Sequence, residues 1–138
     1  LGTRFAAVLI DPRDALINWM VFGSAQAYQF PRSPEVAAGW LSQTFHAVAN
    51  RLENDAETAT AIRMDMIDTD AEAIAVQLKK AMQLDEQPKS ETLAEPILAL
   101  GGLANQFPAG HWRHYRDEFA EAFALLTPVA VRLGYPAD

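Results

Sequence analysis

The sequence predicts an all-α fold, a single globular bundle of about six to eight helices over residues 1–138. Apolar residues recur at helical spacing through most of the chain, and no segment keeps the period-two alternation of a half-buried strand. The apolar stripes are three to four positions wide, which favours a globular bundle over a coiled coil. The length of 138 residues fits one domain.

The stretch Phe107–Val131 is predicted to be the central helix of this bundle. Its apolar face consists of Trp112, Tyr115, Phe119, Ala122, Phe123, Leu126 and Val129. Its charged face consists of Arg116, Asp117, Glu118 and Glu121. A helix with this many aromatic side chains on one face needs several partner helices to cover it. We expect Pro128 to bend or break its last turns.

Two helices in the first half begin at a common start signal, a capping side chain followed by proline. The dipeptides with this pattern are Asp11-Pro12 and Ser33-Pro34. Aspartate and serine accept hydrogen bonds from free main-chain N–H groups, and proline is favoured at the first helical position. The signals predict helices that run to about residues 28 and 53. The apolar segment 1–10 before them is expected to form a short leading helix.

The middle of the chain is predicted to hold further helices. Residues 56–67 form a short helical segment, and Thr69 or Asp70 caps the helix that follows. The apolar side of that helix consists of Ala71, Ile74, Ala75, Leu78, Ala81 and Met82. The polar stretch 85–90 is the clearest loop of the chain, and residues 90–104 form another apolar helical segment.

The composition excludes several classes of function. The chain is 50% apolar and 21% charged, which is enough for a sizeable core. Its net charge of −7 argues against a nucleic-acid surface, because phosphate binding requires a cationic face. No apolar run approaches the roughly 18 residues of a membrane span, and the chain has no cysteine for disulfides or thiolate metal sites. We therefore expect a cytoplasmic protein with no nucleic-acid and no membrane partner.

The histidines and carboxylates do not form a catalytic or metal-binding pattern. His111 and His114 lie three residues apart, but a third ligand is missing and arginines lie beside them. His46, at the edge of an apolar stripe, is expected to be a packed core histidine. The carboxylates of residues 68–72 alternate as in a calcium loop, whose glycine and final glutamate are absent. Because a nucleophile elbow and a phosphate loop are also absent, nothing recommends an enzyme.

Aromatic and methionine side chains are the candidates for a ligand pocket. The predicted ligand-binding residues are Trp40, Phe45, His46, Met64, Met66, Trp112, Tyr115 and Phe119. Side chains of this kind line cavities for apolar or tetrapyrrole ligands. The alternative interpretation is that they fill the core. No metal ligand and no resident cofactor are predicted.

Two stretches of the chain, together about half of it, resemble bacterial globins. Met64–Leu84 is similar to the entry into a globin's distal helix, and Ser90–Phe123 is similar to the proximal helix and the helix after it. The residues that carry the second likeness are Leu100, Gly101, Gly102, Pro108, His111 and Trp112. No histidine stands at Gly102–Asn105, where the iron-binding histidine of a globin would fall. The resemblance therefore implies a haem-free, globin-like sensory or regulatory domain.

The first functional hypothesis is a non-enzymatic sensory or regulatory domain that binds a small apolar ligand or a protein partner. The second is an interaction module that forms a homodimer through the helix over 11–28 or the last helix. The third is a haem protein with unusual ligation by His46, His111 or His114. The first hypothesis predicts a buried cavity near Phe45, Met64 and Trp112.

Overall fold

The chain has a mixed α/β fold. The computed structural model describes residues 4–22, 33–67, 69–82 and 107–138. Within these residues it contains four α-helices, two β-strands and two short 3-10 helices. The prediction of an all-α bundle with six to eight helices is therefore wrong.

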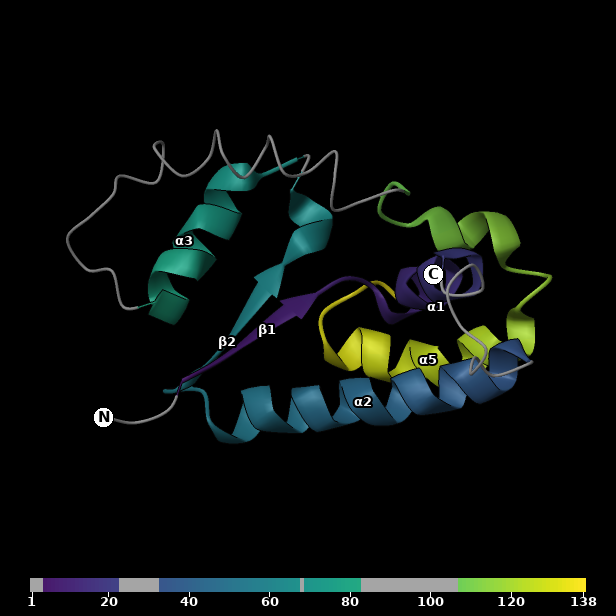
Figure 1. The fold of residues 1–138 in the computed structure, drawn as a ribbon, viewed down its shortest axis with the longest axis horizontal. Coiled ribbons are helices and arrows are strands. Elements are labelled where there is room, and N and C mark those ends of the chain that lie inside the picture. The colour runs from purple at the N-terminus through teal and green to yellow at the C-terminus, as the bar shows by residue number, and fades with distance from the viewer. Residues whose placement is uncertain (1–3, 23–32, 68, 83–106) are drawn as a thin grey trace. The chain divides into compact units, whose positions relative to one another are not determined.

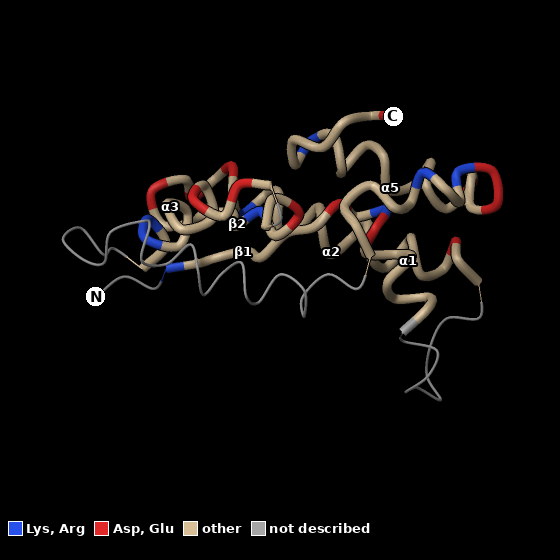
Figure 2. The backbone as a smooth tube through the Cα atoms, turned by 90° about the horizontal axis from the view of Figure 1, so that it is seen from above, with Lys and Arg blue, Asp and Glu red and all other residues tan. Residues whose placement is uncertain are grey.

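The chain divides into two compact units, which are described separately. The first unit comprises residues 1–10 and 51–108, and the second comprises residues 11–50 and 109–138. Acidic positions occur in both units (Figure 2). The assignment of residues 1–138 to one domain stays a prediction.

The first unit contains a parallel two-stranded sheet. Strand β1 (Phe5–Leu9) pairs with β2 (Ala59–Arg63), and the two strands lie side by side in Figure 1. Phe5 is opposite Ala59 at one end, and Leu9 is opposite Arg63 at the other. Helix α3 (Ala71–Met82) packs against β2, and the 3-10 helix η2 (Met64–Met66) connects them.

Both strands stand where the sequence predicts helix, at residues 1–10 and 56–67. Each strand has only five residues, two of them alanine, the residue that favours helices most. A short apolar run of this kind does not distinguish a strand from a helix by periodicity. In β2 the consecutive residues Ala59 and Thr60 are both buried, so the alternation that reveals a half-buried strand is absent.

Helix α3 supplies the core of the first unit. Asp70 caps it, because the Asp70 Oδ1 atom accepts a hydrogen bond from the Ala73 N–H at 2.9 Å. The buried cluster consists of Ile62, Ile67, Ala71, Ile74 and Ala75. The predicted cap is confirmed, and so is most of the predicted apolar side, although Met82 at its end is exposed.

Helices of the second unit begin where the sequence predicts. Helix α1 (Pro12–Phe22) starts after Asp11, whose Oδ1 accepts a hydrogen bond from the Arg13 N–H at 2.9 Å. Helix α2 (Pro34–Asn54) starts after Ser33, whose Oγ accepts one from the Val36 N–H at 3.2 Å. The end of α2 is one residue beyond the predicted end. The end predicted near residue 28, the loop 85–90 and the segment 90–104 lie outside the described residues.

The stretch predicted as one central helix is divided in two. The 3-10 helix η3 (His111–Tyr115) follows Gly110, which has a left-handed φ of 81°, and α5 (Ala120–Arg132) starts only after an intervening turn. The buried face of α5 consists of Ala122, Phe123, Leu126, Val129 and Ala130. Pro128 lies inside α5, so it does not break the helix, and the alternative that it bends the helix stays a prediction.

Helix α5 packs against α1 in the second unit, and α1 also contacts η3. Leu16 and Ile17 of α1 are fully buried, as is Leu126 of α5. No helix in the described part of the chain has the length and apolar character needed to cross a membrane.

Candidate functional site

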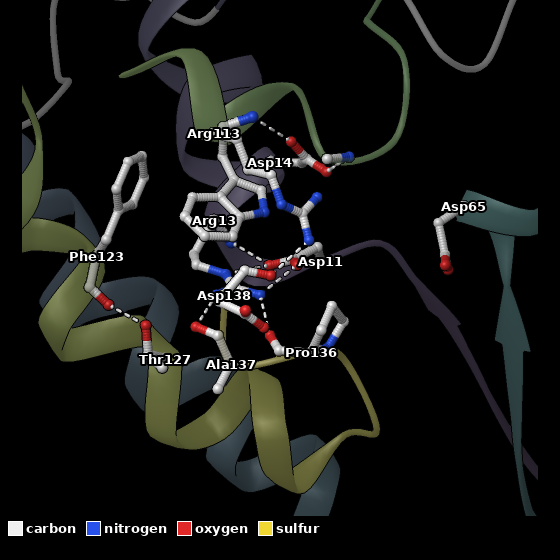
Figure 3. Close-up of polar contacts among 12 residues, drawn as sticks. Asp11, Arg13, Asp14, Asp65, Arg113, Phe123, Thr127, Pro136, Ala137 and Asp138 are labelled. Atoms are coloured by element: carbon white, nitrogen blue, oxygen red, sulfur yellow. Dashed lines mark hydrogen bonds and ion pairs between the residues drawn. The ribbon is translucent and has the colours of Figure 1, made fainter. Parts of the chain in front are cut away.

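A buried arginine at the start of α1 is the centre of a polar cluster in the second unit. The Arg13 side chain is 0% exposed and forms a two-point ion pair with Asp11, with Nε–Oδ1 at 3.0 Å and Nη2–Oδ2 at 2.7 Å. Its guanidinium also donates to the carbonyls of Ala137 at 3.0 Å and Pro136 at 2.6 Å (Figure 3). A fully buried arginine is stable here because each side of its planar fork finds an acceptor.

The Trp112 ring lies under this guanidinium. The Arg13 Cζ atom is 3.8 Å from the ring centroid, a distance typical of a cation–π contact. The Phe123 ring meets Trp112 edge to face, with centroids 5.4 Å apart. Trp112 is only 3% exposed, and its Nε1–H has no hydrogen-bond partner among the residues that the structure describes. Buried indole N–H groups usually have an acceptor, so this donor is a feature to explain.

Asp14, in the first turn of α1, fixes the start of η3. Its Oδ2 accepts a hydrogen bond from the Gly110 N–H at 2.6 Å, and its Oδ1 accepts one from the Trp112 N–H at 2.8 Å. Burial raises the pKa of Asp14 above its ordinary 3.8, and the two main-chain donors oppose this increase. The carboxylate therefore acts as a crosslink between two segments that are distant in the sequence.

Residues 136–138 are held through their main chain. Arg13 binds the carbonyls of Pro136 and Ala137, and Arg113 Nη2 donates to the main-chain oxygen of Asp138 at 2.6 Å. The left-handed φ of Gly110, just before η3, favours glycine at that position. We call residues 136–138, which the two arginines hold, the carboxyl strap.

A groove lies beside the strap. It has a volume of about 330 Å³ and is open to solvent. Its lining residues are Trp112, Arg116, Ala120, Phe123, Ala124, Thr127, Ala137 and Asp138. The Thr127 hydroxyl donates to the Phe123 carbonyl at 2.8 Å. Arg116 is exposed and has no ion pair with another described residue.

One of the predicted ligand-binding residues lines this groove, and two more are connected to its wall through ring contacts. Trp112 lines it. The Phe119 ring is 6.0 Å from that of Phe123, and the Tyr115 ring is 6.1 Å from that of Phe119. The aromatic side chains of η3 and α5 thus form a continuous series that ends in the groove.

The other predicted residues of the second unit lie on α2 and do not line the groove. Trp40 is 51% exposed, and its ring is 6.2 Å from that of Trp19. Phe45 is half-buried. His46 is half-buried and is not part of the core, so the prediction of a packed core histidine is wrong; its Nδ1 is 3.3 Å from Nη1 of Arg132.

The two predicted methionines belong to the first unit. Met64 and Met66 pack against the core cluster around Ile62 and Ile67. A pocket that combines them with the aromatic residues of the second unit stays a prediction.

The remaining histidines lie at the beginning of η3. The His111 ring is 5.3 Å from that of His114 and 5.4 Å from that of Tyr115. Within the residues that the structure describes, no group of three or more histidines and carboxylates is placed to hold a metal ion. Haem ligation by a histidine of this chain stays a prediction.

Sequence analysis missed four residues of this site. Asp11 is interpreted there only as a cap and Arg116 only as part of the charged face, while Arg13 and Asp14 are not singled out. The one available signal was the density of charge at residues 11–14 directly after an apolar segment. Their partners lie at the other end of the chain, so no local pattern identifies them.

No protein-family model matches the chain, and neither does any curated protein or solved structure. The resemblance to globins therefore stays a prediction.

Proposed function

We propose that the chain is a non-enzymatic regulatory domain whose second unit binds a small, mainly apolar ligand in the groove between α5 and the carboxyl strap. The observation that carries this proposal is the groove itself. Its volume of about 330 Å³ is at the lower end of the range for small-molecule sites.

The lining supports an apolar occupant. Ala120 and Ala124 present small side chains from exposed positions of α5, and Phe123 and Trp112 form the aromatic part of the wall. Small residues beside rings leave room for a flat or branched hydrocarbon body. Removing such a body from water stabilises the complex by about 25 cal/mol per Å² of apolar surface.

The polar groups of the site support binding rather than catalysis. Both oxygens of Asp14 accept main-chain N–H groups, and Asp11 is paired with Arg13. A general base needs a free lone pair within reach of its substrate. These two carboxylates are instead used to hold η3 and Arg13 in place.

Regulation would act through the strap. Ala137 and Asp138 line the groove and are attached to the rest of the unit through main-chain carbonyls. A ligand that touches them changes the free-energy difference between the held and released strap. Because the ligand binds one of these two states more tightly, it shifts the populations of the held and the released strap.

Titration of a single-tryptophan protein tests this proposal. Replacing Trp19 and Trp40 by phenylalanine leaves Trp112 as the only indole. The probe is the neutral dye N-phenyl-1-naphthylamine, and its binding is followed by energy transfer from Trp112. The filling variant Ala124→Leu occupies the groove, while Ala47→Leu, an exposed alanine on α2, is its control.

We expect saturable binding that Ala124→Leu weakens at least about tenfold, the effect of roughly 1.4 kcal/mol. Ala47→Leu should bind as the parent protein does. Equal binding by both leucine variants, or no saturable binding at all, would refute the groove as a ligand site.

A second candidate function, homodimerisation, is favoured by the pair Trp19 and Trp40. Trp40 is 51% exposed, and Val36, one turn before it on α2, is 47% exposed. Aromatic side chains are enriched at the centres of protein interfaces. Sedimentation of the parent chain and of Trp40→Gln tests this: a dimer that the variant converts to monomer is the expected result. A monomeric parent at high concentration would rule it out.

A further inference from the structure

The chain directly before the carboxyl strap is firmly anchored. The Gly134 N–H donates to the Val131 carbonyl at 3.0 Å. The Tyr135 N–H donates to the Ala130 carbonyl, also at 3.0 Å. Together with the left-handed φ of 87° at Gly134, these two bonds form a common closing motif of a helix. Because the Tyr135 side chain is only 5% exposed, the residues up to Tyr135 belong to the packed part of the second unit.

The strap itself, residues 136–138, is attached in a different way. Its three side chains are all exposed, and its contacts with Arg13 and Arg113 use main-chain oxygens (Figure 3). Lifting the strap therefore uncovers little apolar surface, and it returns the conformational freedom of three residues to the chain. Segments with few buried apolar contacts open at low free energy while the rest of a protein stays folded.

Arg13 keeps its position without the strap. Its Nε and Nη2 atoms bind the two oxygens of Asp11, and its Cζ atom lies 3.8 Å from the centroid of the Trp112 ring. We propose that the strap is a detachable latch, which opens as a unit between Tyr135 and Pro136 while α5 and Arg13 stay in place. The role of this latch rests on the proposed function, whose regulation it specifies, but its motion belongs to the free protein.

Opening of the latch changes the groove. Ala137 and Asp138 belong to its lining, whereas the aromatic wall formed by Trp112 and Phe123 stays in place. The open form therefore lacks one wall, and a ligand that contacts the strap binds the closed form more tightly. Such a ligand shifts the population toward the closed latch. The Arg13 side chain, 0% exposed in the closed form, becomes accessible to water in the open form.

Backbone ¹⁵N relaxation of the full chain tests the latch. Pro136→Gly keeps every main-chain carbonyl that the arginines bind but makes the open strap more flexible, so it should favour opening. Arg113→Ala removes one of the donors that hold the strap. In both variants we expect the order parameters of the Ala137 and Asp138 N–H groups to fall together, from about 0.85 in the parent to below about 0.6. Tyr135 should keep its parent value.

Arg116→Ala is the matched control, because it removes the same charge from an exposed residue three positions after Arg113. It should leave the order parameters of the strap unchanged. The latch is overturned if Tyr135 loosens together with the strap, if Asp138 loosens alone, or if both variants leave the strap rigid. It is also overturned if the parent strap is already as mobile as that of the variants, because the arginines would then not hold it.

Titration with the neutral dye gives a second readout. If half of the Pro136→Gly molecules are open, the apparent Kd of the dye should double, because half of the molecules then lack the complete groove. An unchanged Kd in a variant whose strap has loosened would contradict the coupling of the latch to the groove. If the dye does not bind the parent protein at all, the proposed function fails, while the relaxation data still decide whether the latch exists.

Discussion

Replacing Arg13 with methionine would leave the Asp11 carboxylate buried without its counter-ion. The Arg13 side chain is 0% exposed and Asp11 is 5% exposed, so water cannot take the place of the guanidinium. Removing one partner of a buried ion pair destabilises a protein by about 3–5 kcal/mol. The total free energy of unfolding of a domain is about 5–15 kcal/mol, so we expect a severe loss of stability.

Two further variants separate charge from geometry. Arg13→Lys keeps the positive charge but loses the planar fork that donates four side-chain hydrogen bonds to described residues. If two of these bonds are lost, the penalty is about 2 kcal/mol. Combining Arg13→Met with Asp11→Asn removes both charges. The double variant should therefore be more stable than Arg13→Met alone, because no uncompensated charge remains buried.

Urea unfolding, followed by Trp112 fluorescence in the Trp19→Phe and Trp40→Phe background, measures these effects. With a slope of about 2 kcal/mol per M, a loss of 4 kcal/mol lowers the midpoint by about 2 M. Trp112 reports on the second unit, where the change is made. If Arg13→Met does not fold, the lysine variant and the double variant still give the comparison.

The reasoning would be refuted by an Arg13→Met protein whose stability lies within about 1 kcal/mol of the parent. It would also be refuted by a double variant less stable than Arg13→Met, because then the charge of Asp11 would not be the source of the loss. A lysine variant equal to the parent would show that the two-point pairing with Asp11 contributes nothing.

Other parts of the chain give further expected outcomes. Ile74→Ala in the core of the first unit should lower the free energy of unfolding by about 2–5 kcal/mol. The control Val76→Ala, at an exposed position of the same helix, should change it by less than about 1 kcal/mol. Equal effects of the two variants would contradict the described core. Asp70→Ala should remove the cap of α3 and cost about 1 kcal/mol, measured by thermal unfolding. Burial raises the folded-state pKa of Asp14 above 3.8, so the folded protein binds this proton more tightly than the unfolded chain does. The stabilisation from this proton is therefore lost as pH rises from about 4 through the folded-state pKa. The measurement is the free energy of unfolding of the parent minus that of Asp14→Asn, which should fall over this pH range. A difference that rises with pH would contradict the prediction.

Helix starts could be predicted because their chemistry is local. Each described α-helix that begins after a predicted cap has its first N–H groups within reach of a side chain one to three residues away. Asp11, Ser33 and Asp70 all act as predicted. The spacing of apolar residues likewise identified most of the buried face of α3 and of α5.

The strands could not be predicted because their stabilisation is not local. β1 and β2 are separated by more than the length of two helices, and the pairing of Phe5 with Ala59 supplies the hydrogen bonds that their own residues do not specify. Their alanines favour helix within any short window. Pairing with a distant segment outweighs such a weak local preference, which amounts to less than about 1 kcal/mol per residue.

The candidate site shows the same division between local and distant chemistry within a single residue. Asp11 is a helix cap, and the sequence indicates that role correctly. The Asp11 carboxylate also pairs with Arg13, and Arg13 donates to the Ala137 carbonyl, 124 positions away in the chain. Asp14 reaches Trp112 across 98 positions. Because the acceptors of Arg13 in the strap are main-chain carbonyls, which every residue has, no residue type at positions 136–138 could have revealed them. A site built from side chains on one segment and main chain on another is visible only once the fold has brought the two together.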